Sequence, residues 1–179
     1  MEIVWDVYLA DSLKAGTISK RGQGQRRKVL LLAPFPSTWK SFLMIDENKS
    51  DLVCFLSKEI ERTQVSRKIL VSTCSDSVVS SSTEVDLNNM SGCTHEEADT
   101  RAFLHVAGCV KQGQKAILPT ADTDVVVLAI SVVEKIKVEE LWAAFGTGKH
   151  FKCTAAHGIA SSFGADKSRT LPAFHAVRL

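Results

Sequence analysis

The chain has 179 residues, of which 45% are hydrophobic and 23% are charged, and its formal net charge is +2. This ordinary globular composition is enough for one sizeable core, so we expect a single domain over residues 1–179. The chain has no apolar run long enough to span a bilayer and no basic-then-apolar leader, which excludes a membrane-embedded protein. Its cysteines include no C-x-x-C arrangement, which argues against a disulfide framework. We therefore expect an intracellular protein, nuclear or cytoplasmic, without a membrane partner.

The first half of the chain predicts strands and helices around one breaker segment. Glu2–Val7 has the pattern of a strand that ends at Asp6, whereas Leu30–Pro36 contains two prolines and interrupts regular structure. An amphipathic helix is predicted over Ser50–Glu61, with Ser50 as its N-cap. Its apolar residues at helical spacing are Leu52, Val53, Leu56 and Ile60. The remaining elements are a short helix, a strand and an edge strand, over Thr38–Met44, Lys68–Thr73 and Val78–Val79.

The second half alternates helices with strands. A helix over His95–Lys111 is predicted to bury Ala98, Ala102, Phe103, Val106 and Val110 and to stop at Gly113. Val125–Val133 is apolar throughout, and its length does not decide between helix and strand. The other predicted elements are a buried strand over Ala116–Leu118, a strand over Leu141–Phe145, and helices over His157–Phe163 and Ser168–Val177 that separate at Gly164. This alternation predicts an α/β domain with a mainly parallel central sheet flanked by helices.

A basic segment over residues 12–28 contains no acid. Its cations are Lys14, Lys20, Arg21, Arg26, Arg27 and Lys28. A cluster of this density is typical of a surface that contacts phosphates, and a solvated basic loop is the alternative.

Residues 94–130 contain two acidic pairs. Glu97 and Asp99 stand in the first turn of a predicted helix, and Asp122 and Asp124 follow the Ala116–Leu118 strand. Acids at a helix start and at the carboxyl end of a strand can meet at the edge of an α/β sheet. Converging carboxylates require a cation, and hard oxygen ligands suit Mg²⁺ or Mn²⁺, ions that support phosphoryl hydrolysis.

Each pair also has a purely structural interpretation. Thr94 with Glu97 fits a capping box, and acids in a first turn are favoured by the helix dipole. Asp122-Thr123-Asp124 has the composition of a turn that caps a following helix. The combination of two pairs joined by a helix and a strand is what favours a metal site.

Other candidate sites are weaker. Gly146-Thr147-Gly148-Lys149 is not a P-loop, because the motif needs glycine at Ala143 and Ser or Thr at His150. His150, Cys153 and His157 have tolerable metal-ligand spacing, but Cys153 and His157 fall across a strand-to-helix boundary, which favours packing. The remaining candidates are expected to be solvated or to take part in packing. They are His95 and Cys93 beside the first acidic pair, His105 on the helix face of Arg101, and Cys54 and Cys109, which lie near apolar stripes and are expected to behave as small hydrophobes.

The order of these motifs resembles the flap-endonuclease branch of the PIN-like nucleases. The motifs are Asp6 at a strand end, Lys14 and Lys20-Arg21 in a basic segment, Glu97-Ala98-Asp99 at a helix start, and Asp122-Thr123-Asp124 after a strand. HEEADTR (His95–Arg101) and DTDVVVLAI (Asp122–Ile130) also resemble signatures of a large group of uncharacterised PIN-like proteins, over nearly the whole chain.

The resemblance implies a three-layer PIN-like fold and hydrolysis of phosphodiester bonds in DNA or RNA. It places two Mg²⁺ or Mn²⁺ ions on Glu97, Asp99, Asp122 and Asp124, with Asp6 contributing, and it places Lys14 and Arg21 against the scissile phosphate as catalytic residues. Such an arrangement activates a water and neutralises the leaving oxygen.

The chain also departs from the family pattern. The family has a further Asp near its N-terminus and another acidic site after the segment that is Leu171–Ala176 here, and neither has a counterpart in this chain. We therefore expect a PIN-like domain that is incomplete at both ends, which leaves its activity open. The alternatives are a non-catalytic nucleic-acid-binding or scaffold domain, and a Mg²⁺-dependent phosphatase of small esters.

Overall fold

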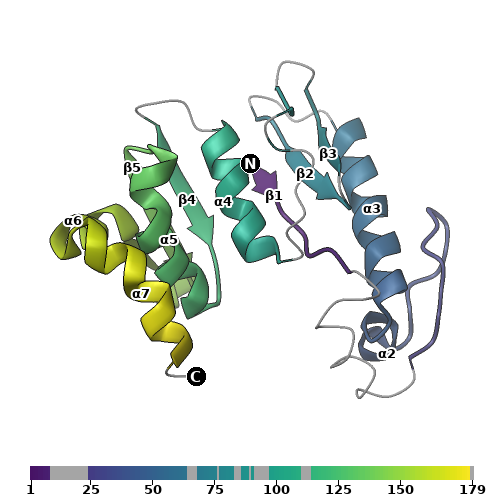
Figure 1. The fold of residues 1–179 in the computed structure, drawn as a ribbon. Helices are drawn as coiled ribbons and strands as arrows, with labels where there is room; N and C mark the ends of the chain where they lie inside the picture. Colours follow the sequence, from purple (N-terminus) through teal and green to yellow (C-terminus); the bar gives the residue numbers. More distant parts are fainter. Residues whose placement is uncertain are drawn as a thin grey trace. The chain divides into compact units, whose positions relative to one another are not determined.

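The computed structural model describes residues 1–8, 24–63, 68–75, 77–82, 86–88, 90, 97–109 and 114–177 (Figure 1). The chain divides into two compact units, Met1–Arg101 and Ala102–Leu179. Each unit combines a sheet with helices, so the α/β class predicted from the sequence is confirmed. None of the described helices is both long and apolar enough to cross a membrane.

The first unit contains a three-stranded sheet in the order β1-β2-β3. Its strands are β1 (Glu2–Ile3), β2 (Val71–Cys74) and β3 (Ser77–Ser80), with β1 parallel and β3 antiparallel to β2. The first strand is shorter than the predicted Glu2–Val7, because the backbone N–H of Trp5 donates to the side-chain oxygen of Thr73, at 2.9 Å, and leaves the backbone ladder. Asp6 therefore lies three residues beyond the strand.

Two helices follow one another in the first unit, α2 (Trp39–Leu43) and α3 (Asp46–Arg62). The short helix confirms the prediction over Thr38–Met44. The long helix begins earlier than predicted, so Ser50 lies inside it and Ile45 is the N-cap residue. Asp46 and Glu47 occupy the first turn, where negative charge is favoured by the helix dipole, and this explains the earlier start.

Polar side chains fill the interface between α3 and the sheet. Ser57 is fully buried, and its hydroxyl lies 2.9 Å from the Ser72 hydroxyl and donates to the Thr73 carbonyl at 2.7 Å. The Trp5 indole N–H also donates to the Ser72 hydroxyl, at 3.1 Å. Ser57 thus lies on the side of α3 that meets β2, whereas Leu56 of the predicted apolar stripe remains 37% exposed.

Asn48 joins α3 to the irregular segment 24–28. Its side chain is fully buried and uses both ends of its amide: the oxygen accepts from the Arg27 backbone N–H at 2.8 Å and from the Arg26 guanidinium at 3.0 Å. The nitrogen donates to the carbonyls of Gln25 and Phe42, at 2.8 and 2.9 Å. Gly24 completes the contact, since a Cβ there would lie 2.6 Å from the Ser41 carbonyl oxygen.

We expect Asn48→Ala to destabilise the first unit by about 2–4 kcal/mol, because four hydrogen bonds are lost and buried backbone groups are left without partners. Urea unfolding of the full chain measures the change. Lys40→Ala, on the exposed side of α2, is the matched control and should shift the free energy of unfolding by less than about 0.5 kcal/mol. Equal stability of the two variants would contradict the role assigned to Asn48.

The second unit contains another three-stranded sheet, in the order β4-β5-β6. Its strands are β4 (Lys115–Pro119), β5 (Glu140–Phe145) and β6 (Lys152–Ala155). The first two are parallel, and β5 and β6 are antiparallel. The predicted strand at Ala116–Leu118 is confirmed, but it is not fully buried, since Ile117 is 66% exposed at the sheet edge. The sequence pattern missed β6, because Lys152–Ala155 is short and half exposed.

The described strands thus form two small mixed sheets, whereas the alternation of elements predicts one mainly parallel sheet. The sheets are mixed because the connections from β2 to β3 and from β5 to β6 are short. Only Ser75 and Asp76 separate β2 from β3, and six residues separate β5 from β6. Connections of that length permit antiparallel pairing alone, because a parallel crossover needs a dozen residues or more.

Helices cover the sheet of the second unit. These are α4 (Ala98–Cys109), which begins in the first unit, α5 (Thr123–Ile136), α6 (Ala156–Phe163) and α7 (Ala165–Val177). The undecided segment Val125–Val133 is helical, and it contributes four of its residues to the buried core: Val125, Ala129, Ile130 and Val133. Fully buried Leu141 of β5 packs into the same core. As predicted, Gly164 separates two helices, α6 and α7.

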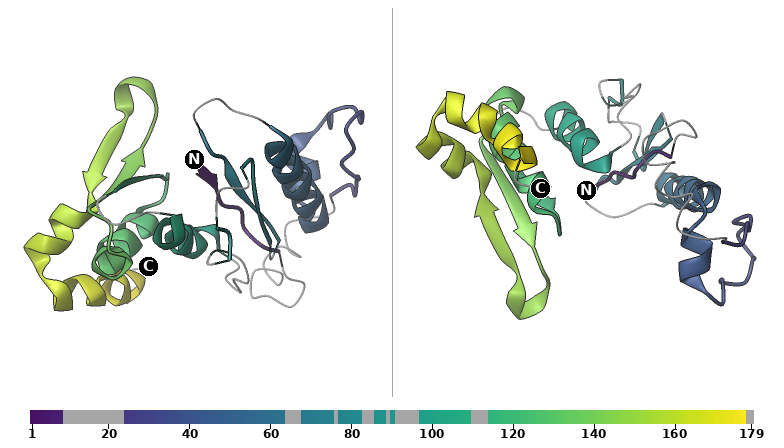
Figure 2. Two further views of the ribbon diagram at one scale, coloured as in Figure 1. Left: turned by 90° about the horizontal axis from the view of Figure 1, so that it is seen from above. Right: turned by 60° about the horizontal axis from the view of Figure 1, so that its bottom comes forward.

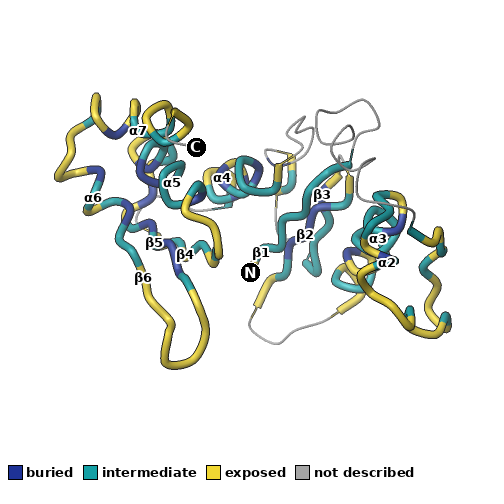
Figure 3. Tube along the Cα trace, turned by 90° about the horizontal axis from the view of Figure 1, so that it is seen from below, coloured by how far each residue is buried: buried dark blue, intermediate teal, exposed yellow. Residues whose placement is uncertain are grey.

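A hairpin of β5 and β6 extends away from the helices of its unit (Figure 2). Its tip, residues 146–150, is exposed along its whole length (Figure 3). Gly146 has a φ of +73°, and a Cβ there would lie 2.6 Å from the His150 carbonyl oxygen, so the turn requires glycine. Because a P-loop joins a strand to a long helix, this hairpin agrees with the rejection of Gly146–Lys149 as one.

Candidate functional site

Asp6 lies at the start of α4, next to the first acidic pair. Its carboxylate accepts a hydrogen bond from the Ala98 backbone N–H at 2.8 Å, across 92 residues of sequence. Ala98 is the first residue of the helix and stands between Glu97 and Asp99. The first unit thus places the Asp6 carboxylate against the backbone between Glu97 and Asp99.

Tyr8 adds a second sign that these acids are close together. Burial is the main cause that raises the pKa of its phenol, and the carboxylates of Asp6, Asp46 and Glu97 raise it further. The ammonium of Lys49 lies 4.5 Å from the centre of the Tyr8 ring. Tyr8 therefore lies within electrostatic range of both Asp6 and Glu97.

The second acidic pair begins α5. Asp122 is the N-cap residue, and its carboxylate accepts from the Asp124 backbone N–H at 3.0 Å. This confirms the structural interpretation, in which Asp122-Thr123-Asp124 caps a helix. The Asp122 backbone N–H in turn donates to the Thr120 hydroxyl, at 3.0 Å, so the turn holds the aspartate in place.

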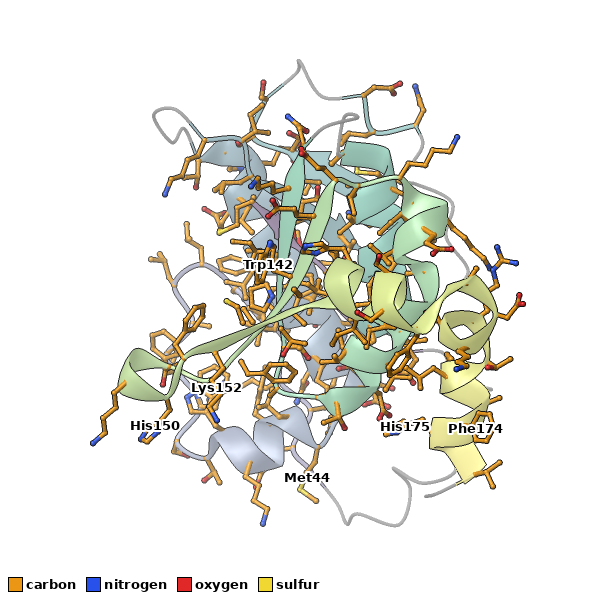
Figure 4. All side chains as sticks on the ribbon, turned by 90° about the vertical axis from the view of Figure 1, so that its left-hand side faces the viewer. Met44, Trp142, His150, Lys152, Phe174 and His175 are labelled. Atoms are coloured by element: carbon orange, nitrogen blue, oxygen red, sulfur yellow. The ribbon has the colours of Figure 1, made fainter. Side chains whose placement is uncertain are left out.

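Asp124 has a partner that the sequence does not suggest. The Nε2 atom of His175, on α7, lies 2.6 Å from Oδ1 of Asp124. Figure 4 shows His175 beside Phe174 near the end of α7. The Asp124 side chain is 49% exposed and that of His175 is 30% exposed, so the pair is accessible from solvent.

The two acidic pairs belong to different units, Glu97 and Asp99 to the first and Asp122 and Asp124 to the second. Among the described residues, no three His, Cys, Asp or Glu side chains are arranged to hold a metal ion. The chemistry of the donors still fits a hard divalent cation, because carboxylate oxygens are the ligands that Mg²⁺ and Mn²⁺ prefer.

The basic segment is described only in part. Lys14, Lys20 and Arg21 lie outside the described residues. Arg26 is held by Asn48 and by an ion pair with Asp51 at 2.7 Å, so its guanidinium has a structural role. Arg27 and Lys28 form no ion pair with another described residue, and they remain candidates for phosphate contact.

Two polar residues of α4 are buried. Arg101 is fully buried, and its guanidinium donates to the Ser75 carbonyl at 2.6 Å and lies 3.5 Å from the Ser77 carbonyl. His105, one turn further on, is 1% exposed. His105 is therefore buried in the protein and is not a solvated residue. In the HEEADTR stretch, Arg101 ties the helix to the β2–β3 turn.

Cys54 and Cys74 contact each other between α3 and β2, with 2.6 Å between their sulfur atoms. Burial, followed by the hydrogen bond to Cys54, raises the pKa of the Cys74 thiol to about 11. The expectation that Cys54 acts as a small hydrophobe is incomplete, because its sulfur accepts this hydrogen bond. Both cysteines are free thiols and half-buried.

We expect iodoacetamide to modify Cys74 about a hundredfold more slowly at pH 8 than it modifies the exposed Cys153, because only the thiolate reacts. The rate at Cys74 should increase up to a pH of about 11. The raised pKa also makes stability depend on pH: the unfolded thiol ionises at a lower pH than the folded one, so the first unit becomes less stable as the pH increases from 9.0 towards 11. Peptide mass spectrometry measures the rates. Modification of Cys74 as fast as Cys153 at pH 8 would contradict the assignment.

The second histidine and cysteine group does not form a metal site. His150 lies at the hairpin tip (Figure 4) and Cys153 on β6. His157 lies in the first turn of α6, and its Nδ1 lies 3.1–3.2 Å from the backbone oxygen and nitrogen of Leu141. The His157 ring also packs edge-on against Trp142, with 5.3 Å between centroids. Packing is therefore the role of His157, as expected. His95 and Cys93 lie outside the described residues.

Sequence reasoning missed Tyr8 and His175. Tyr8 follows Asp6 by two residues and lies in a segment with strand pattern, so alternation could have placed both on one side of the chain. No local signal could have indicated His175, which is 51 residues from Asp124. Comparison of the chain with protein families, with curated proteins and with solved structures finds no match.

Proposed function

We propose that this chain is a PIN-like domain of the flap-endonuclease type, which hydrolyses phosphodiester bonds of DNA or RNA with Mg²⁺ or Mn²⁺. The observation that carries the proposal is the hydrogen bond from Ala98 to Asp6, which sets an acid of the N-terminal segment beside Glu97 and Asp99. The proposed relationship requires a mainly parallel sheet, whereas the described residues have one parallel pair in each of two small mixed sheets, β1–β2 and β4–β5.

Each residue has a proposed role in this reaction. Asp6, Glu97, Asp99, Asp122 and Asp124 would hold the ions, which supply an activated water and stabilise the leaving oxygen. Lys14 and Arg21 would neutralise the phosphate as negative charge develops on it. His175 would orient Asp124, as hydrogen-bond partners of ligating carboxylates do.

A cleavage assay tests the proposal. Purified full chain is incubated with labelled single-stranded and branched DNA and RNA in Mg²⁺, in Mn²⁺, and in excess chelator. We expect cleavage with either ion and none with chelator. Turnover of small phosphate esters, with no cleavage of any polynucleotide, would assign the site to a phosphatase and refute the nuclease.

A second candidate function is nucleic-acid binding without cleavage. The structure favours it at one point: the Asp122 carboxylate caps α5, and that of Asp124 is paired with His175, so both already have structural partners. A binding domain of this kind would bind polynucleotides with an affinity whose logarithm falls linearly with the logarithm of salt concentration, and no metal would produce cleavage. Asp99→Ala would leave that binding intact.

A further inference from the structure

Two adjoining hollows lie on the first unit, between the irregular segment 24–38 and helices α2 and α3. The polar hollow, about 320 Å³, is lined among others by Gln25, Arg27, Ser37, Thr38 and Ser41. The apolar hollow, about 210 Å³, is lined by leucines and aromatic rings together with Arg27 and Lys28. Arg27, Pro36 and Phe42 line both, so the hollows adjoin each other.

The apolar hollow presents aromatic faces to solvent. Phe35 is 83% exposed and Trp39 is 43% exposed, with 6.0 Å between their ring centroids. The Trp39 ring is supported from behind by buried Phe42, at 5.5 Å and edge-on. Leu52, Phe55 and Leu56 of α3 form the floor. Leu52 and Leu56 belong to the predicted apolar stripe of this helix, so part of the stripe lines the hollow.

The charged side chains that line the two hollows are basic. None of the described residues that line either hollow is acidic, whereas Arg27 and Lys28 are basic and form no ion pair with another described residue. The nearby Arg26 is neutralised by Asp51. Asn48 accepts a hydrogen bond from the backbone N–H of Arg27, so the fold holds the backbone from which this cation extends. The surface is therefore complementary to an anion that also has flat apolar groups.

We propose that the two hollows bind an unpaired strand of nucleic acid, with a phosphate in the polar hollow and a base against Trp39 and Phe35. The inference rests on the proposed function, whose substrate class it specifies. Arg27 supplies charge, and the hydroxyls of Ser37, Thr38 and Ser41 supply donors for phosphate oxygens. Stacking on aromatic rings requires an exposed base face, which a duplex does not offer, so single strands are preferred.

A protein partner is the rival occupant. Its apolar side chains would fill the apolar hollow, but the polar hollow lies directly beside it and offers hydroxyls and a guanidinium. Alternating phosphates and bases match this juxtaposition, because each nucleotide has one anionic and one flat apolar part. A leucine-rich peptide with acidic residues is the form of protein that the surface would accept, and it enters the test as a competitor.

Binding of fluorescein-labelled oligo(dT) and oligo(U), each of about 12 nucleotides, is measured by anisotropy over a range of salt concentrations with the full chain and chelator present. Trp39→Leu should weaken binding about 5- to 150-fold without changing the salt slope, because a base stack is lost. Arg27→Ala and Lys28→Ala should each weaken binding and reduce the slope by about 0.7, because one phosphate contact is lost. Trp39→Phe keeps an aromatic face and should bind within about threefold of wild type.

Two substitutions in the second unit are the controls. Phe163→Leu removes an aromatic ring that is 44% exposed, close to the exposure of Trp39, and Lys167→Ala removes an exposed cation. Both should bind like wild type. If Trp39→Leu does not fold, as judged by circular dichroism, Trp39→Phe and Lys28→Ala carry the test through the affinity and the salt slope.

Binding by Trp39→Leu within twofold of wild type would overturn the inference, as would an acidic leucine-rich peptide that binds where no oligonucleotide does. The inference and the proposed function fail separately. Binding that depends on Trp39, without cleavage in Mg²⁺ or Mn²⁺, would refute the nuclease and leave the inference standing. Metal-dependent cleavage with binding that is independent of Trp39 would refute the inference alone.

Discussion

Asp122→Asn should reduce metal-dependent cleavage about a hundredfold or more while leaving the fold intact. Asparagine caps a helix as well as aspartate does, so the hydrogen bond from the Asp124 N–H is kept and the free energy of unfolding should change by less than about 0.5 kcal/mol. The charge is lost, however, and removal of one group that stabilises the charge of a transition state costs about this much in rate. Steady-state cleavage and urea unfolding of the same samples separate the two effects.

Two further variants complete this experiment. Asp122→Ala removes both the charge and the cap, and should be less stable than Asp122→Asn by about 1 kcal/mol. Asp166→Asn removes an exposed acid from the first turn of α7 and should cleave like wild type. If Asp122→Asn and wild type cleave equally, Asp122 is a helix cap and nothing more, and the nuclease assignment fails.

Arg101→Ala should destabilise the chain by about 2–4 kcal/mol, because hydrogen bonds from a charged donor are lost and a large buried side chain is removed. The guanidinium fastens α4 to the β2–β3 turn, where Ser75 adopts a φ of +53°. Loss of this contact should also increase hydrogen exchange at Ser77–Ser80, since β3 is held at the sheet edge by β2 and by α3.

Arg62→Ala is the matched control for Arg101→Ala. Arg62 also donates to an oxygen, that of Glu59 at 2.8 Å, but its side chain is 71% exposed. An exposed pair of this kind contributes little, so the substitution should cost less than about 0.5 kcal/mol. Similar unfolding free energies for the two variants would show that Arg101 is not a structural clamp.

Elements with a strong local signal could be predicted from the sequence. Val71–Cys74 and Glu140–Phe145 are strands because β-branched and apolar residues follow one another there, and Asp122 caps α5 because its side chain reaches a backbone N–H two residues away. The helical state of Val125–Val133 was left undecided by its apolar pattern. The N-cap and the left-handed Lys137 at the other end, with φ of 54°, mark its limits.

Interactions between distant residues could not be predicted in this way. Ser57 looks like a solvent-facing residue of an amphipathic helix, and only its contacts with Ser72 and Thr73 make burial favourable. Asn48 is buried for the same reason, since three of its four partners are more than 20 residues away, at Gln25, Arg26 and Arg27. The pairing of His175 with Asp124 is likewise determined by the packing of α7 on α5.

In the candidate site, too, local sequence patterns predict some features, whereas contacts between distant residues determine the others. Patterns of acids locate Glu97, Asp99, Asp122 and Asp124 and their helices, because helix starts favour such residues. The neighbourhood of Asp6, Tyr8 and Glu97 depends on the chain returning to the same place after about 90 residues, and periodicity contains no information on that return.

Mn²⁺ binding by isothermal titration calorimetry tests the metal site most directly, with wild type, Asp99→Asn, Asp124→Asn and the control Asp166→Asn. We expect wild type and Asp166→Asn to bind Mn²⁺ alike, and each of the other two variants to bind about tenfold more weakly or worse. Binding that is unaffected by both Asp99→Asn and Asp124→Asn, or no binding by wild type at all, would contradict the proposed role of these carboxylates.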